Sequence, residues 1–395
     1  HDLTENIIHL VLAKMPDSPD NVKGISLFIV PKFLVNDDGS LGERNAVSCG
    51  SIEKKMGIHG NSTCVLNYDG ATGYLIGEKE KGLAAMFIMM NAARLGVGLQ
   101  GLSLSEAAYQ NAVVYARERL QGRALTGAAN PDAKADPIIV HPDVRRMLMD
   151  IRAFNESARA LALWAGLLVD LAHKAESEEE RQQADDLVGL LTPVIKGCFT
   201  DKGFENAVLA QQVFGGHGYI REHGMEQFVR DARIAQIYEG ANGIQALDLV
   251  GRKLPRHGGR ALQAYNRLIN EAIAEAKGTE ELKPLAEALE RSVGHLQAAT
   301  MWLMQNALAN PNHAGAAAYP YMQLAGLVSL GLMWLKISRA SLEALANGEG
   351  DETWLRNKLV LANHFASRHL PDTAALRRKV EAGADTVMAL AEEDF

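Results

Sequence analysis

RIAQIYEGANGIQALDLVGRKL (residues 233–254) places one acidic residue, Glu239, in a tight turn directly before a helical pattern. Gly240 and Ala241 follow it, and from Asn242 onward apolar residues recur three or four positions apart, which predicts an amphipathic helix with Asn242 as its N-cap. The acid has two interpretations. It either complements the helix dipole, or it acts as a base in a cleft where backbone N–H groups stabilise developing negative charge. Spacing alone leaves both open.

Long helical patterns occupy most of the chain around this turn. Apolar residues recur at helical spacing over 80–120, 141–175 and 180–214, and Pro193 is expected to interrupt the last of these stretches. Together with the helix after the turn, they predict an antiparallel helical bundle. Further helical patterns follow a Pro- and Gly-rich basic hinge at 252–260, which predicts an additional all-helical domain.

The first 78 residues have a different pattern. Short runs rich in Ile, Val and Leu alternate with Asp, Pro, Asn and Gly, and no helical segment intervenes. The fold class predicted is therefore mainly α with a partial antiparallel β-domain, divided into 1–78, 79–255 and 260–395. Because the chain begins inside a strand-like run, HDLTENIIHLVLAKM, we expect it to be a fragment of a longer protein.

The composition excludes several classes of function. The chain has 395 residues, 47% of them hydrophobic, and a net charge of -8, which argues against a nucleic-acid partner. Cys49, Cys64 and Cys198 form no CxxC pair, which favours a reducing, cytoplasmic compartment, and no histidine spacing predicts a metal site. No apolar run reaches the ~20 residues of a membrane span, so no transmembrane segment is predicted.

Two further motifs could bind anions. The glycine pair of VFGGHGY (213–219) would let backbone N–H groups approach a phosphate, although such a turn is more often a plain helix–helix connection. Arg94 and a cluster of three arginines could supply cations, although arginines at helix ends are commonly just solvated. The cluster consists of Arg117, Arg119 and Arg123.

Four segments resemble the acyl-CoA dehydrogenase family in order and spacing. They are MNAARLGVGLQGLSLSEAAY, YARERLQGRAL, QVFGGHGY and RDARIAQIYEGANGIQ. The family places its catalytic base in an Ile-Tyr-Glu-Gly turn, so the last segment is the most specific. The resemblance covers residues 1–254, and 260–395 resembles the C-terminal extension of a bacterial subgroup. It implies an acyl-CoA dehydrogenase-like C-terminal helical bundle plus an additional C-terminal helical domain.

The resemblance implies an oxidoreductase of fatty acid metabolism and β-oxidation. Glu239 would remove the α-proton of an acyl-CoA thioester while the β-hydrogen leaves as hydride to N5 of FAD, giving the trans-2-enoyl-CoA. Electrons would pass to an electron-transfer flavoprotein, and the protein would be a homodimer or a higher homo-oligomer. The family's N-terminal helical domain and half of its β-domain are not in this sequence, so activity is expected of the complete protein. An acyl-CoA oxidase using O2 and a non-catalytic helical assembly module remain alternatives.

The resemblance also implies site residues around the base Glu239. Contacts with the acyl-CoA are implied for Asn91, Arg94 and Gly240, and contacts with the FAD pyrophosphate for Arg119 and Gln121. The residues that would reach the adenosine end of an FAD bound to a neighbouring subunit are Gln212, Val213, Phe214, Gly215 and Gly216. Those that would line the cofactor after the base are Ala241, Asn242 and Gly243, and Ala241 stands where the family usually has Thr.

Overall fold

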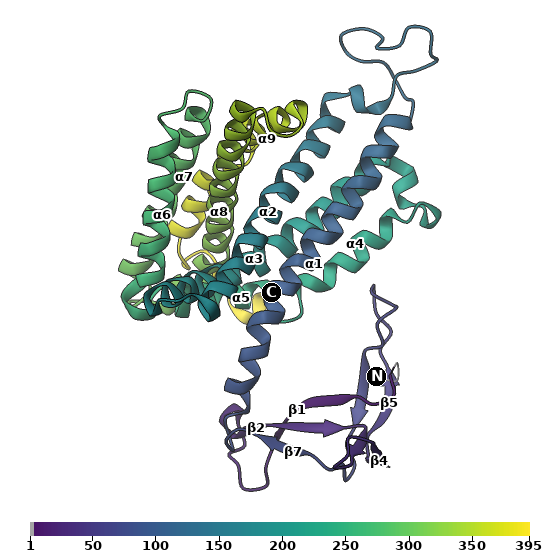
Figure 1. The fold of residues 1–395 in the computed structure, drawn as a ribbon, viewed down its shortest axis with the longest axis vertical. Coiled ribbons are helices and arrows are strands. Elements are labelled where there is room, and N and C mark those ends of the chain that lie inside the picture. Colours follow the sequence, from purple (N-terminus) through teal and green to yellow (C-terminus); the bar gives the residue numbers. More distant parts are fainter. Residues whose placement is uncertain (1–3) are drawn as a thin grey trace. The chain divides into compact units, whose positions relative to one another are not determined.

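The computed structural model describes residues 4–395 and divides at residue 93 into two compact units (Figure 1). The first unit contains the strands, and the second, Arg94–Phe395, contains no strand among the described residues apart from a single bridge between Leu120 and Pro137. The predicted fold class, mainly α with a small antiparallel β-region, is confirmed.

The first unit holds one three-stranded antiparallel sheet and two separate strand pairs. The sheet has the order β1-β2-β7, and β3 pairs with β4 and β5 with β6. The strands are β1 (Ile8–Lys14), β2 (Ile25–Pro31), β3 (Phe33–Val35), β4 (Leu41–Arg44), β5 (Ser48–Ile52), β6 (Cys64–Asn67) and β7 (Tyr74–Ile76). Sequence patterning did not identify β4 and β5, because they are short, mostly exposed and lie among turn residues.

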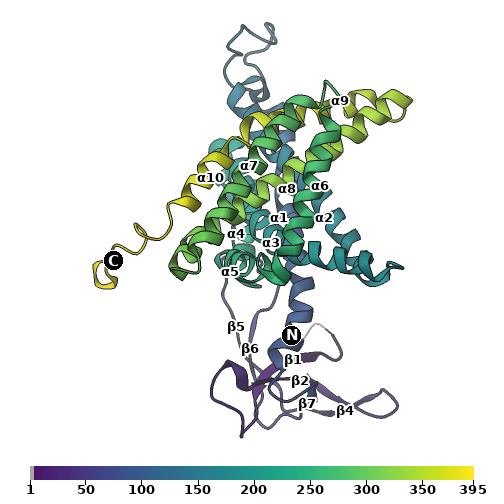
Figure 2. The same cartoon turned by 90° about the vertical axis from the view of Figure 1, so that its left-hand side faces the viewer.

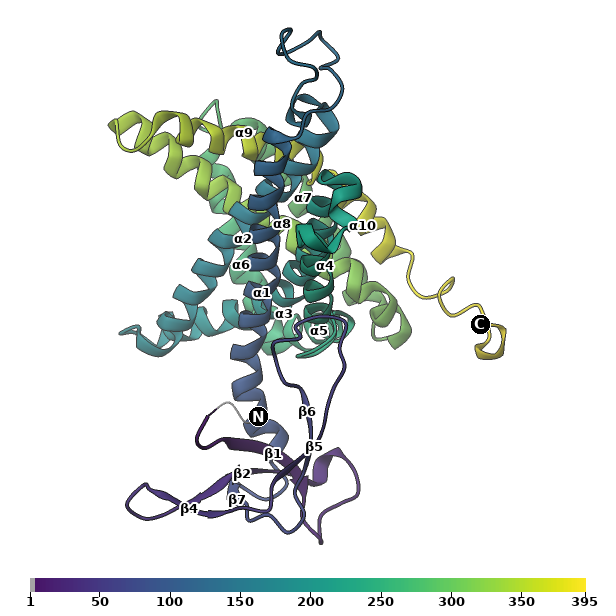
Figure 3. The same cartoon turned by 90° about the vertical axis from the view of Figure 1, so that its right-hand side faces the viewer.

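The second unit is built from long helices packed side by side. Figure 2 shows α6, α7, α8 and α10 next to one another, and Figure 3 shows α1 running beside α3. The helices are α1 (Gly82–Glu118), α2 (Pro142–Lys174), α3 (Glu178–Val213), α4 (Met225–Arg233), α5 (Asn242–Asp248), α6 (Arg260–Ala276), α7 (Lys283–Asn306), α8 (Pro311–Asn347), α9 (Glu352–Arg368) and α10 (Asp372–Glu381).

Two local expectations about helix ends have different outcomes. The predicted interruption at Pro193 is wrong, because α3 continues through it and buries the surrounding turns on both sides. The predicted hinge is present. His257, Gly258 and Gly259 all have positive φ, between 51° and 79°, so the helical path breaks there and restarts at Arg260.

The helices before and after this hinge share one hydrophobic core. The indole N–H of Trp334, fully buried on α8, donates to the carbonyl of Ala153 on α2 at 3.1 Å. A Cβ built on Gly197 of α3 would lie 2.4 Å from the sulfur of Met322 on α8, so the Met322 side chain fills the space that this glycine leaves. Residues 94–395 therefore pack as one unit, and a domain boundary at 255–260 stays a prediction.

Helix α1 is the one described helix that is long and apolar enough to cross a membrane. Its part in the second unit is a packing helix, however, because Leu102, Ala108, Ala112 and Ala116 are buried in that unit. The same length and composition occur in core helices of proteins that do not cross a membrane.

Candidate functional site

Glu239 lies in a short irregular turn between two helical segments. The chain leaves a 3-10 turn at Gln236 and enters α5 at Asn242. Glu239 has a φ of 57°, in the left-handed region that non-glycine residues rarely adopt, and the φ of Gly240 is 87°. A strained backbone at a charged residue persists only where its surroundings fix it, and such residues cluster at functional sites.

The side chain of Glu239 keeps one oxygen unused. Its Oε2 is buried and has no hydrogen-bond partner among the described residues. On the backbone side, the Gln245 amide donates to the carbonyls of Glu239 and Gly240 at 3.4 and 3.3 Å. A Cβ on Gly240 would lie 2.5 Å from that amide nitrogen, and the positive φ of residue 240 favours glycine. A carboxylate with an unsatisfied buried oxygen is suited to accept a proton from a bound molecule.

Lys196, in the middle of α3, lies directly beneath this turn. Its ammonium is fully buried and donates to the carbonyl of Gly240 and to Oδ1 of Asn242, both at 2.8 Å. Burial lowers the pKa of the Lys196 ammonium to about 8, although the carboxylates of Asp201 and Glu239 act in the opposite direction. Lys196 thus fixes the carbonyl directly after Glu239 and brings positive charge near the carboxylate.

Asn242 does not act as the predicted N-cap. The cap position is Ala241, no side chain bonds the first turn of α5, and Asn242 turns inward instead. Its Nδ2 donates to the Thr200 hydroxyl at 2.9 Å and to the Asp201 carboxylate at 2.7 Å, so a buried polar network outcompetes local capping. The cofactor contact implied for Asn242 remains a prediction for its backbone.

Asp201 connects the turn to the C-terminal helices. Its Oδ1 accepts from the amides of Gln236 at 2.8 Å and Asn242 at 2.7 Å. Its Oδ2 accepts from the Tyr319 hydroxyl and the Gln323 amide, both at 2.6 Å. The carboxylate is almost completely buried, and these four donors replace the water it loses.

Arg94, predicted to contact CoA, is buried beside the same turn. One of its guanidinium nitrogens lies 3.5 Å from a carboxylate oxygen of Asp248 on α5. This ion pair holds the N-terminal end of the second unit to α5, and a CoA contact for Arg94 stays a prediction. Asn91 is exposed and belongs to the first unit, three residues earlier on α1, so its implied contact is also untested.

The buried face of α5 differs from the predicted one. Ile244 and Leu247 were expected to face the core, but they are about half exposed, while the polar Gln245 and Asp248 are buried. The polar network under Glu239 sets the rotation of the helix, because unpaired buried polar groups cost more than exposed apolar ones. Ala241 and Gly243, implied to line the cofactor, are exposed on the same helix end as Ile244.

A groove of about 580 Å³ lies at the C-terminal end of α3. It brings together every residue implied for the pyrophosphate and adenosine contacts, although the two groups are some ninety positions apart in sequence. Its lining includes Arg119, Gln121, Gln212, Val213, Phe214, Gly215 and Gly216. This juxtaposition was expected only from the resemblance, because spacing in the sequence does not place these segments side by side.

The chemistry of this groove suits an anion attached to a flat ring. Arg119 provides a cation, and a Cβ at Gly215 or Gly216 would meet nothing within 4 Å, so the backbone there is open to a ligand. Tyr115 stacks on Phe214 with ring centroids 4.1 Å apart, and its hydroxyl bonds His217 at 2.9 Å. His217 is therefore held in place in the wall of the groove.

Asp136 organises the loop that carries Arg119 and Gln121. Its carboxylate accepts the backbone N–H groups of Ala129, Ala124 and Asn130, and these hydrogen bonds hold the pKa of Asp136 well below its usual range. Arg123 bonds this carboxylate as well, at 3.3 Å, so the structure uses Arg123 inside the loop rather than in the groove.

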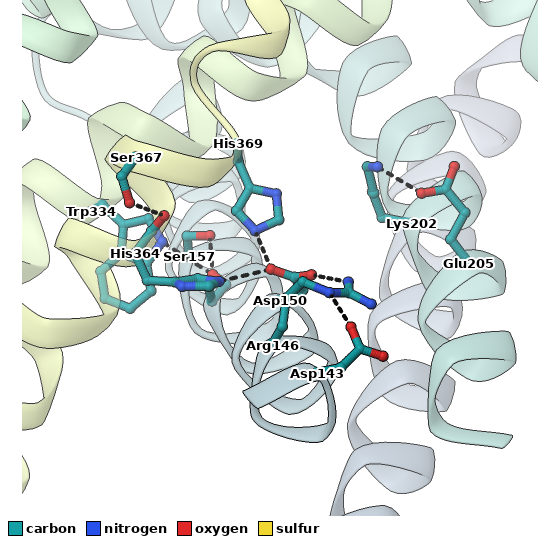
Figure 4. Close-up of polar contacts among 11 residues, drawn as sticks. Asp143, Arg146, Asp150, Ser157, Lys202, Glu205, Trp334, His364, Ser367 and His369 are labelled. Carbon is teal, nitrogen blue, oxygen red and sulfur yellow. Dashed lines mark hydrogen bonds and ion pairs between the residues drawn. The ribbon is translucent and has the colours of Figure 1, made fainter. Parts of the chain in front are cut away.

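A second cluster of titratable groups joins α2 to the end of α9 (Figure 4). One oxygen of Asp150 lies 2.7 Å from Nε2 of His364 and 3.3 Å from Nε2 of His369, and the other oxygen pairs with Arg146 at 2.9 Å. Three such groups could in principle bind a cation, but the Arg146 guanidinium already neutralises the carboxylate and would repel one. The cluster acts as a polar connection between the two helices.

Sequence reasoning missed the residues beneath Glu239. Lys196, Asp201, Gln245 and Asp248 all support the turn, yet none belongs to a recognised spacing. One signal was available: Lys196 interrupts the apolar run LLTPVIKGCF, and a lysine inside such a run must find buried partners.

Two family descriptions match the helical part of the chain. "Acyl-CoA dehydrogenase, C-terminal domain" matches residues 80–254, and "Acetyl-CoA dehydrogenase C-terminal like" matches residues 266–391. A 3-methylmercaptopropionyl-CoA dehydrogenase of Ruegeria pomeroyi is 43% identical over 98% of this chain, and the chain covers 65% of that protein. The broad-specificity linear acyl-CoA dehydrogenase FadE5 of Mycobacterium tuberculosis is 34% identical over 100% of the chain, which covers 67% of it. The chain thus spans about two thirds of the length of these relatives.

Solved structures show the same fold. Caenorhabditis elegans ACDH-11, solved in complex with C11-CoA, matches 96% of this chain with a TM-score of 0.76 at 20% identity, and the chain covers 60% of it. An acyl-CoA dehydrogenase from Bacillus anthracis, complexed with FAD, matches 94% with a TM-score of 0.73 at 20% identity, again over 60% of its length. With the sequence relatives and both domain matches pointing the same way, this chain belongs to the acyl-CoA dehydrogenase family.

Proposed function

We propose that the complete protein carrying this chain is a FAD-dependent acyl-CoA dehydrogenase in which Glu239 removes the α-proton of the thioester. The proposal rests on the family and on one observation above all: a glutamate held in a left-handed turn with a buried oxygen that has no partner among the described residues. A residue that only complemented a helix dipole would need neither the strain nor the burial.

FAD is the cofactor that membership of this family supports. The groove beside Gly215 and Gly216 fits a pyrophosphate: Arg119 supplies charge, Gln121 supplies an amide, and the open glycine backbone supplies N–H donors. FAD, when bound, accepts the β-hydrogen of the substrate as hydride.

The residues of this chain would perform the proton half of the reaction. Glu239 accepts the α-proton, and the buried Lys196 and Gln245 hold the backbone carbonyls around Glu239 so that the carboxylate keeps its direction. A backbone N–H in a fixed turn can stabilise the thioester oxygen as it gains enolate character, because its dipole is oriented before the reaction starts. Gly240, with its positive φ, lets the chain turn directly after the base.

The names of the relatives favour an unbranched acyl group as the substrate class. The Ruegeria enzyme is named for 3-methylmercaptopropionyl-CoA, the mycobacterial one for linear acyl-CoA, and two Syntrophomonas wolfei relatives, 32% and 31% identical, for butyryl-CoA. We extend this class to the complete protein, with an electron-transfer flavoprotein as the electron acceptor and a homo-oligomer as its assembly.

An anaerobic titration tests this function. The complete protein, purified with its flavin, is mixed with short linear, long linear and branched acyl-CoAs while the oxidised-flavin absorbance is followed. Wild type is expected to bleach with linear substrates, and Glu239→Gln is expected to retain FAD and lose bleaching by at least about 10³-fold in rate. Glu226→Gln is the matched control, because Glu226 is an acid on nearby α4 that pairs with Arg230; it should bleach like wild type.

Three other outcomes would change the proposal. Bleaching undiminished in Glu239→Gln would mean that another group is the base. Rapid O2 consumption without an added acceptor would favour an acyl-CoA oxidase. A complete protein without flavin would favour the helical assembly module.

A further inference from the structure

We propose that helix α8 of the C-terminal region positions the catalytic turn: Tyr319 and Gln323 hold Asp201, which in turn holds the chain on both sides of Glu239. This inference rests on the proposed function for its catalytic consequence, whereas the mechanical connection can be measured by itself. It gives the C-terminal helices a part in the reaction through two hydrogen bonds to Asp201.

The two oxygens of Asp201 divide their partners between two parts of the chain. Oδ2 takes its hydrogen bonds from α8, through Tyr319 and Gln323, both at 2.6 Å. Oδ1 takes its hydrogen bonds from the turn, through Gln236 and Asn242 at 2.8 and 2.7 Å. Gln236 stands three residues before Glu239 and Asn242 three residues after it, so one carboxylate fixes both ends of the turn.

Because Asp201 is buried, the loss of any of these hydrogen bonds is costly. The residue is only 5% exposed, so solvent cannot replace a lost donor without a local rearrangement. Tyr319 is 44% exposed, but partial burial of its hydroxyl end and the hydrogen bond to Asp201 raise its pKa above the usual value, so the phenol stays a donor at neutral pH. Removal of both donors from Oδ2 leaves a buried charge half satisfied, and rotation of the carboxylate to find new partners would move Oδ1 and the turn with it.

The packing of α8 against α3 is close enough to transmit this restraint. Tyr319 and Gln323 lie one turn apart on α8, and Met322 between them packs where Gly197 lacks a side chain. The Cys198 thiol also bonds the carbonyl of Met322, at 3.3 Å. The backbone of α8 is therefore fixed relative to α3 at the same level as Asp201. A loss of the hydrogen bonds from Tyr319 and Gln323 cannot be compensated by a movement of the helix.

A double variant, Tyr319→Phe with Gln323→Met, removes both donors and keeps size. The control is Tyr321→Phe, on the same helix, where the lost hydroxyl bonds Thr300 at 2.8 Å and leads away from the turn. Both are made in the complete protein. Two measurements are taken: amide hydrogen exchange of a peptide covering residues 236–248, and kcat and KM with a linear acyl-CoA.

We expect faster exchange in that peptide for the double variant and a kcat about tenfold lower, with KM within about twofold, because a misdirected base slows the chemical step more than binding. Tyr321→Phe should lower the melting temperature at least as much yet leave the exchange of 236–248 and kcat unchanged. Unaltered exchange and kcat in the double variant would overturn the inference. So would equal changes in the Tyr321→Phe control.

The Glu239→Gln variant separates this test from the proposed function. If Glu239→Gln is inactive and the double variant exchanges and turns over like wild type, the base is correct and the positioning role is wrong. If Glu239→Gln is fully active while the double variant still loosens 236–248, the connection from α8 to the turn is real but the turn does not carry the base.

Discussion

Two carboxylates, Asp201 and Asp150, each join the central helices to the C-terminal helices, but in different surroundings. Asp201 is almost completely buried, and its donors are neutral amides and a phenol. Asp150 is half-buried and pairs with Arg146, His364 and His369. Both connect helices that are far apart in sequence.

The difference lies in what each carboxylate touches next. Asp201 bonds the segment that contains Glu239. The partners of Asp150 lie near the start of α2 and at the end of α9, and no candidate site residue is among them (Figure 4). Asp201 is also far less accessible to water, which therefore cannot easily replace a lost donor. We therefore expect substitutions at Asp201 to lower both kcat and the free energy of unfolding, and substitutions at Asp150 to lower only the free energy of unfolding.

Asp201→Asn should have the largest effect among the supporting residues. The NH2 group of the new asparagine cannot accept a hydrogen bond. It would face either the two donors of α8 or the two donors of the turn, and that pair would lose its acceptor. We expect a loss of about 2–3 kcal/mol in the free energy of unfolding and a kcat about 10²-fold lower. Chemical denaturation and steady-state kinetics measure these. A variant with wild-type kcat would remove the distinction between the two carboxylates.

Lys196→Met should come next. It removes the donor to the Gly240 carbonyl and to Asn242, and we expect a kcat about tenfold lower. The pH dependence gives a second signature. Because the folded pKa of Lys196, about 8, is below the unfolded value, the unfolded chain binds more protons between these pKa values, and Lys196 makes the protein more stable as pH rises from about 8 to about 10.4.

That contribution should be missing from Lys196→Met. Denaturation of both proteins across this pH range measures it. Parallel stability curves for wild type and variant would mean that Lys196 keeps an ordinary pKa in the fold.

Gly240→Ala tests the turn itself. The new methyl would lie 2.5 Å from the Gln245 amide nitrogen, and the φ of 87° disfavours alanine, so we expect a loss of about 1–3 kcal/mol in the free energy of unfolding. Gly243→Ala is the matched control for stability, because a Cβ there meets nothing within 4 Å and the residue is helical. Equal destabilisation by both changes would argue against a strained turn at 240.

Asp150→Asn should have the smallest effect, about 1 kcal/mol in the free energy of unfolding and none on kcat. Burial alone would raise the pKa of Asp150, but hydrogen bonds and charge from His364 and His369 outweigh it and hold the pKa well below its usual range. Its contribution to stability is therefore present above about pH 4 and declines as the pH falls toward the lowered folded pKa.

Thermal melts of wild type and Asp150→Asn between neutral and acid pH check this dependence. The difference in melting temperature should shrink on acidification. A change in kcat at neutral pH would show that the Asp150 connection also reaches the catalytic turn.

Much of the fold followed from periodic patterns in the sequence. The long helices α1, α2 and α3 are many turns long and carry strong helical spacing, so their positions were predicted closely. The short exposed strands β4 and β5 were not, because their residues are also turn formers. The interruption expected at Pro193 failed because packing on both sides of α3 outweighs the one hydrogen bond that proline removes.

The site was predictable only in part, and for a physical reason. Glu239 and the groove residues belong to segments that resemble a known family, so they could be named in advance. Lys196, Asp201, Tyr319 and Gln323 act through contacts between residues up to 122 positions apart, and no local pattern marks such pairs. The inward turn of Asn242 shows the same limit, since its N-cap pattern was locally sound and tertiary partners overrode it.

The most direct test of the account is exchange of the α-hydrogen of a linear acyl-CoA with solvent deuterium, measured by mass spectrometry on the complete flavin-loaded protein without an electron acceptor. This reaction needs removal of the α-proton but no hydride transfer. The account predicts exchange catalysed by wild type, none above background in Glu239→Gln, and reduced exchange in Asp201→Asn. Exchange by Glu239→Gln at the wild-type rate would contradict the assignment of Glu239 as the base.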